Sequence, residues 1–331
     1  MISFELAGVL AGGSLSVPSE NLSILSDTQT GQPIVLHHGN GTATRLVTQN
    51  NSLAEADSLS LLSESRTTLG PDVSPHSLAQ PVITHLEHTA SASMSGSVST
   101  FLNNIDHHNQ SACLLGYRWD DTLLLYVAQP STGGISVYSQ DTQGGLNFVT
   151  ETFSGDPMHG SGISCMARIK TPSGDFLFSG STLSHCLAAY QIDASGIPQY
   201  IGSIGANDGS FPVQTITAMV PAQIEGTNYL VVAASDSSSL SVLEVANDGQ
   251  LTVKDHALDS SLSRFAGVTE IDTITVNGHV FIFATGSDDG ISVMSLLPGG
   301  RLLPLSTIAD SGSSALQNIS SLKAVLVGDE I

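Results

Sequence analysis

The chain repeats itself at intervals close to 50 residues over its C-terminal two thirds. Small residues recur at steps of 51, 54 and 51, at Ala128, Ser179, Ala233 and Ala284. Apolar residues recur at the same steps, at Val137, Ala188, Val242 and Val293. Turn glycines follow at steps of 51, 53 and 51, at Gly145, Gly196, Gly249 and Gly300. A fourth column is Ile or Val followed by Ser or Thr, at Ile163-Ser164, Ile216-Thr217, Val268-Thr269 and Ile319-Ser320. Four columns in one register predict an array of equal structural units.

Each unit has the pattern of four β-strands. In the third unit the expected strands are residues 215–223, 229–235, 240–245 and 250–258. The second of them is a continuous apolar run, as in a strand buried on both faces, and no helical stripe runs between the strands. Four-stranded units at this period are typical of a β-propeller, because one sheet alone cannot bury both of its apolar faces.

The first third of the chain is less regular. Residues 21–62 are interpreted as another unit, residues 80–102 as a unit that lacks a strand, and residues 316–327 as a first strand without a successor. We therefore expect one propeller domain over residues 1–331, with irregular blades in 1–110 and regular blades in 111–331. Seven blades are predicted, with six as the alternative. The ring is expected to close by pairing of N- and C-terminal strands.

Composition excludes several classes of partner. Nine Lys and Arg face 30 Asp and Glu, and the formal net charge of −21 disfavours nucleic acid and anionic membranes as partners. No segment is apolar enough for a membrane span. Three Cys do not make a disulfide framework and are expected to be buried thiols.

The N-terminal segment is a poor signal peptide, because it lacks a basic start and carries Glu5. The expected setting is extracellular or on a particle surface, by a route without a cleaved signal, with the cytoplasm as alternative.

The motifs Gly267-Val268-Thr269, Gly286-Ser287-Asp288-Asp289-Gly290 and Gly299-Gly300-Arg301 resemble lactonase-like seven-bladed propellers. They are most similar to the propeller at the front of secreted bacterial RTX-type calcium-binding proteins. The resemblance covers roughly residues 110–331 and implies the blade, not an activity. The chain lacks the RTX nonapeptide array, so the calcium sites of that family are not carried over.

No motif specifies a catalytic or cofactor site. The chain has no nucleophile elbow, phosphate loop or dinucleotide fingerprint. Histidines gather before residue 109, but His85 and His88 in one strand would point to opposite faces. We therefore expect no metal and no cofactor.

Ligands of propellers usually bind at one mouth of the ring, on loops that enter the innermost strands. The candidates on these loops are His159, Gln214, Arg264 and Gln317. An Arg, a His and amides that converge on the axis would hold a polar ligand or polarise an ester. Alternatively, they only hydrate the channel.

Two functions are carried forward. The missing catalytic constellation favours a non-catalytic binding or structural module that presents loops to a protein or carbohydrate partner. The alternative, which rests on the resemblance, is a lactonase-like hydrolase acting at the central mouth. The oligomeric state is left open.

Overall fold

A computed structural model describes residues 22–26, 33–39, 42–49, 52–60, 83–86, 113–119, 122–129, 134–141, 146–153, 162–206, 209–311, 316, 317, 319, 322–324 and 331. Every regular element in these residues is a β-strand. In the described part of the chain, no helix has the length and apolar character needed to cross a membrane.

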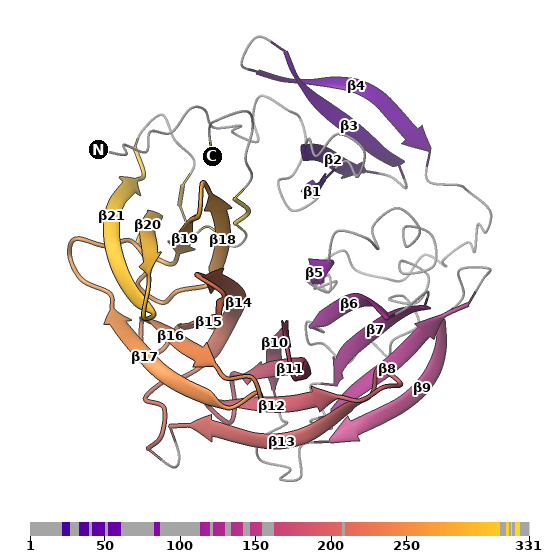
Figure 1. Cartoon of the computed structure of the whole chain (residues 1–331). Coiled ribbons are helices and arrows are strands. Elements are labelled where there is room, and N and C mark those ends of the chain that lie inside the picture. Colours follow the sequence, from indigo (N-terminus) through magenta and orange to yellow (C-terminus); the bar gives the residue numbers. More distant parts are fainter. Residues whose placement is uncertain are drawn as a thin grey trace, which may run out of the picture.

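Three consecutive antiparallel sheets carry the last three of the four regular repeats (Figure 1). The first contains β10 (Ile163–Thr171), β11 (Gly174–Ser181), β12 (Cys186–Ile192) and β13 (Pro198–Gly205). The second contains β14 (Ile216–Ile224), β15 (Thr227–Ala234), β16 (Ser239–Val245) and β17 (Leu251–Leu258). The third contains β18 (Glu270–Val276), β19 (His279–Thr285), β20 (Gly290–Leu297) and β21 (Arg301–Ala309). Within each sheet the strands follow chain order, so each repeat is one sheet.

Two further sheets come from the preceding part of the chain. One contains β1 (Leu22–Ser26), β2 (Pro33–Gly39), β3 (Thr42–Gln49) and β4 (Ser52–Ser60), which confirms the unit predicted for residues 21–62. The other contains β5 (Ile83–Leu86), β6 (Leu114–Trp119), β7 (Thr122–Gln129), β8 (Gly134–Gln140) and β9 (Leu146–Phe153). Because β5 pairs in parallel with β6, it extends this sheet and is not the second strand of a separate blade.

The sheets are arranged as propeller blades around a common centre. In Figure 1 the strands β10, β14 and β18 lie toward the middle, and β9, β13, β17 and β21 form the rim. The innermost strands of consecutive repeats contact one another, as β10 does with β14 and β14 with β18. The predicted propeller of four-stranded blades is thereby confirmed. The described residues form five sheets, and the predicted total of seven and the closing strand pair involve residues outside this description.

The middle strands form the core, as the apolar runs predicted. Ala233 on β15 and Ala284 on β19 are fully buried, and Ser179 on β11 is 1% exposed. One core cluster lies between the sheets of β11 and β15 and a second lies between those of β15 and β19. The three cysteines are buried, as expected.

The Ser and Thr residues of the fourth sequence column donate hydrogen bonds between blades. The hydroxyl of Thr217 donates to the carbonyl of Val268 over 2.8 Å, and that of Thr269 donates to Ile319 over 2.9 Å. Ser164 makes the same bond to Ile216. Each hydroxyl therefore joins one repeat to the equivalent residue of the next repeat, which explains why the column keeps a hydroxyl residue.

Candidate functional site

Three charged side chains meet where the innermost strand of the last described sheet faces the chain segment that follows it. We call Glu270, Asp272 and Lys323 the axial site. Glu270 and Asp272 lie two residues apart on β18, and alternation along a strand directs both to the same side. Lys323 lies in the segment 322–324, which packs on the same sheet through Leu322 and Ala324.

Asp272 is the fixed member of the axial site. Its side chain is 7% exposed and accepts a hydrogen bond from Lys323 Nζ over 3.0 Å. Its second oxygen accepts the backbone N–H of Ala324 over 2.8 Å. Two charge-assisted bonds compensate the desolvation of the carboxylate and hold the lysine at the inner strand. Lys323 itself is 45% exposed, so its ammonium remains accessible.

Glu270 is the member whose protonation is perturbed. Burial raises the pKa of its carboxyl to about 7. The Ile271 N–H, which donates to Oε1 over 3.3 Å, and the nearby Lys323 lower that pKa, whereas the charge of Asp272 raises it. Desolvation has the largest effect on this pKa. Near pH 7 Glu270 is therefore present in both its neutral and its charged form.

Glu270 is the first residue of β18, an innermost strand that lies toward the centre of the ring. Its charge raises the pKa of the buried Cys165 thiol on β10, after the larger effects of burial and of Cys113. The sheet of β14–β17 separates β10 from β18 in the ring, so residues of these two strands approach one another only near the axis. Two innermost strands, β10 and β18, therefore contribute side chains to one neighbourhood near the centre of the ring.

A half-buried carboxyl with a pKa near neutrality suits general acid–base catalysis, because it takes and returns a proton at little energetic cost. An accessible ammonium beside it can polarise a carbonyl oxygen. Together these two groups are able to promote attack of water on an ester.

The predicted mouth residues lie elsewhere. Gln214 is exposed, and its backbone N–H donates to Ser237 Oγ over 3.3 Å. Arg264 is half-buried and directs its guanidinium to the carbonyl of Asp288 at 3.3 Å. Gln317 donates to Asp310 over 3.2 Å. Each of the three is thus held by its own loop or by the adjacent turn, and His159 lies outside the described residues.

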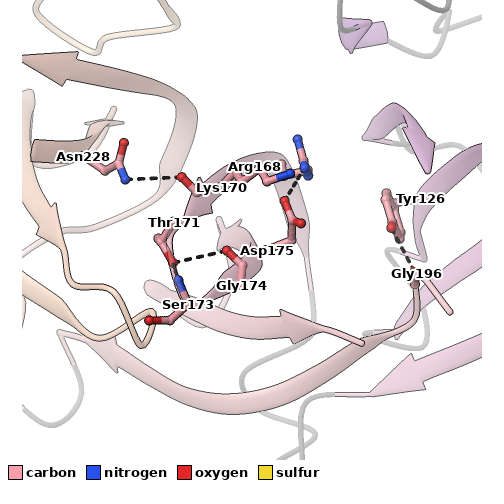
Figure 2. Close-up of polar contacts among 9 residues, drawn as sticks. All are labelled: Tyr126, Arg168, Lys170, Thr171, Ser173, Gly174, Asp175, Gly196 and Asn228. Carbon is pink, nitrogen blue, oxygen red and sulfur yellow. Dashed lines mark hydrogen bonds and ion pairs between the residues drawn. The ribbon is translucent and has the colours of Figure 1, made fainter. Parts of the chain in front are cut away.

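A second charged cluster joins the sheet of β6–β9 to the sheet of β10–β13 (Figure 2). Arg168 on β10 pairs with Asp175 on β11, and its guanidinium stacks 3.4 Å from the centre of the Tyr117 ring. Nearby, the hydroxyl of Tyr126 donates to the carbonyl of Gly196 over 2.9 Å. Arg168 and Asp175 are at most 10% exposed, so this cluster acts as a joint between sheets.

Metal ligands do not gather in the described part of the chain, where no group of three or more His, Cys, Asp or Glu has the geometry for an ion. The Asp-rich turn 286–290 has turn chemistry instead. Ser287 N–H donates to the carbonyl of Ala266 over 2.7 Å, and Asp289 takes a positive φ of 52°.

The axial site was not predicted, although the sequence contains a signal for it. Four residues after each Ile or Val of the fourth column stand Ala167, Val220, Asp272 and Lys323. Two apolar residues are thus followed by an acid and a base at equivalent positions in consecutive repeats. Equivalent positions on neighbouring inner strands lie side by side, and the opposite charges form the observed pair.

No family model matches the chain. No curated protein matches it either. Solved structures similar to it include a protein proposed to be a 6-phosphogluconolactonase from Bacteroides uniformis, with 13% identity, a TM-score of 0.49, and coverage of 90% of this chain and 80% of that one. The periplasmic gluconolactonase of Pseudomonas aeruginosa matches with 14% identity, a TM-score of 0.45, and coverage of 90% and 74%. A Lactobacillus plantarum protein matches with 12% identity, a TM-score of 0.47, and coverage of 86% and 70%.

The resemblance to lactonase-like propellers is therefore found again among solved structures, as a likeness of fold. The expectation of a non-catalytic binding or structural module is contradicted: similar solved structures bear the names of lactonases, and the likeness concerns the fold. That expectation relied on the absence of a catalytic motif. A site assembled from separate blades leaves no such motif, because its residues are dispersed at the spacing of the repeat.

Proposed function

We propose that this protein is a lactonase-like hydrolase whose reacting groups are those of the axial site. The observation that carries the proposal is Glu270, a half-buried carboxyl on an innermost strand with a pKa raised to about 7. Lys323 is close enough to Glu270 for its charge to lower that pKa, and its ammonium is paired with Asp272.

In the proposed reaction, ionised Glu270 takes a proton from water as the water oxygen attacks the lactone carbonyl. The ammonium of Lys323 stabilises the negative charge that develops on the carbonyl oxygen. When the tetrahedral intermediate collapses, the ring C–O bond breaks and the leaving alkoxide receives the proton from Glu270. The products are a hydroxy acid, which ionises at neutral pH, and the regenerated carboxylate.

Asp272 acts in this scheme as a positioning residue. Its carboxylate fixes the ammonium by one hydrogen bond and the backbone of the same segment by another. The lysine is thereby placed before substrate arrives, and little reorganisation accompanies the reaction.

The test is hydrolysis of a panel of sugar and alkyl lactones by the purified chain, followed by acid release. Glu270→Gln and Lys323→Met are each expected to lower kcat at least 100-fold, in the range found for a lost general base or oxyanion donor. Wild-type activity should rise as the pH passes through about 7, where Glu270 ionises.

The exposed pair of Glu244 and Lys254, 2.8 Å apart on β16 and β17, supplies matched controls. Glu244→Gln and Lys254→Met make the same chemical changes away from the axis and should leave kcat unaltered. No turnover of any lactone by the wild-type chain, or full activity in Glu270→Gln, contradicts the proposal.

We also propose that the mouth residues Gln214, Arg264 and Gln317 contact substrate on its way to the axis. Gln214→Ala tests this role and should raise KM.

We further propose a closer likeness to RTX-type front propellers, and an extracellular or particle-surface setting. The blade columns support the first, and the acidic composition supports the second.

A further inference from the structure

We infer that the axial site acts on an uncharged lactone and that the chain selects against a phosphorylated one. This inference rests on the proposed function and names its substrate class.

Within the axial site, the only cation is neutralised. Lys323 is paired with Asp272 at 3.0 Å, so these two groups sum to zero charge. Glu270 adds either nothing or one negative charge, depending on its protonation. A phosphoryl group carries roughly two negative charges near pH 7 and needs several convergent donors of positive charge. The axial site offers it none that is unpaired.

Three other cations whose side chains the structure describes are also engaged. Arg168 is buried in its pair with Asp175, and Lys254 is paired with Glu244. The guanidinium of Arg264 donates to the carbonyl of Asp288, whose own carboxyl lies within electrostatic reach of Asp259. The mouth cation is therefore surrounded by acidic groups.

Two exposed cations, Lys170 and Arg301, lie at the far end of the blades. Lys170 is near the end of an innermost strand, beside the hairpin between β10 and β11, and Arg301 follows the hairpin between β20 and β21. Because antiparallel strands alternate in direction, these hairpins are at the end opposite to the loops that enter β14 and β18. Neither side chain is placed to attract an anion to the predicted mouth.

The whole chain reinforces this selection. Its nine basic and 30 acidic residues give a net charge of −21, which repels an anion before contact. The same field assists turnover of a neutral lactone, because hydrolysis converts an uncharged ring ester into a carboxylate. Substrate therefore enters without repulsion, and the product is expelled.

The experiment compares kcat/KM for glucono-δ-lactone and for its 6-phosphate at low and high ionic strength. We expect the wild-type chain to prefer the neutral lactone at least tenfold at low salt. Added salt should leave the rate with the neutral lactone unchanged and raise the rate with the phosphorylated one, since it screens long-range repulsion.

Leu262, which is 86% exposed in the loop between β17 and β18, provides a matched pair of variants. Leu262→Lys should raise kcat/KM for the 6-phosphate, Leu262→Glu should lower it, and neither should affect the neutral lactone. A preference of the wild-type chain for the 6-phosphate overturns this inference and leaves the proposed function intact. Failure to hydrolyse either lactone removes the proposed function, and the inference with it.

Discussion

At the scale of single residues, the same position of the repeat serves two purposes. Ala167 and Val220 occupy it in two consecutive blades and are buried in the apolar core. Asp272 and Lys323 occupy it in the next two and form an ion pair. The four residues hold the same place in the sequence repeat, so the change from packing to charge follows from the side chains that stand there.

The Asp272–Lys323 pair should contribute to stability because its acid is buried. We expect Asp272→Ala to lower the free energy of unfolding by about 3 kcal/mol, since it removes two bonds and leaves the ammonium without its partner. The exposed Glu244–Lys254 pair is the comparison, and Glu244→Ala is expected to have a much smaller effect, because solvent screens an exposed pair. Urea denaturation measures both, and equal effects of the two substitutions would contradict the assignment.

Glu270 should make stability depend on pH. Its folded pKa is raised from 4.5 to about 7, so its neutral form is the one that the fold favours. The contribution is fully present below about pH 4.5 and is lost as the pH rises through about 7. Relative to Glu270→Gln, the wild-type chain should lose on the order of 3 kcal/mol between pH 4 and pH 8. A constant difference between the two proteins across this range would show that the carboxyl is solvated.

At the scale of elements, the hairpin glycines connect neighbouring blades. Gly249 and Gly300 both have a φ of +81°, which a turn glycine adopts without strain. A side chain at Gly249 would collide with Phe176 of the preceding blade, and one at Gly300 would come within 2.8 Å of Tyr229. The positive φ of the turn favours glycine, and the close approach of the neighbouring sheet leaves no room for a side chain.

Substitution separates these two reasons. Gly249→Ala is expected to lower the free energy of unfolding by more than 2 kcal/mol, because backbone strain and a clash with a buried ring add together. Gly226→Ala, at a φ of +79° with open space around it, carries the strain alone and should cost about 1 kcal/mol. If thermal or urea unfolding gave the same loss for both variants, the contact between blades would have no energetic weight.

At the scale of the whole molecule, stacking of sheets gives stability and the charge opposes it. The sheet of β14–β17 buries both faces against its neighbours, whereas a net charge of −21 disfavours any compact state by self-repulsion. The few basic residues cannot offset 30 acidic ones.

Salt should therefore stabilise this protein. Raising sodium chloride from about 10 mM to about 200 mM shortens the screening length from roughly 30 Å to below 10 Å and weakens the repulsion. We expect Tm to rise over this range, as measured by circular dichroism. A fall in Tm would indicate that attractive pairs such as Asp272–Lys323 outweigh the overall charge.

The sequence by itself determined the β class, the four-stranded unit and the buried middle strand, because these follow from local alternation, turn residues and a repeat that recurs in register. It also contained the hydroxyl column and the Asp272–Lys323 column, although neither has a meaning within one repeat. Only the tertiary structure decided that Thr217 reaches the carbonyl of Val268, and that Glu270 influences Cys165 from a blade that is not adjacent. Such contacts depend on how far each sheet is rotated about the axis, and that rotation is set by packing between blades rather than by any local preference of the chain.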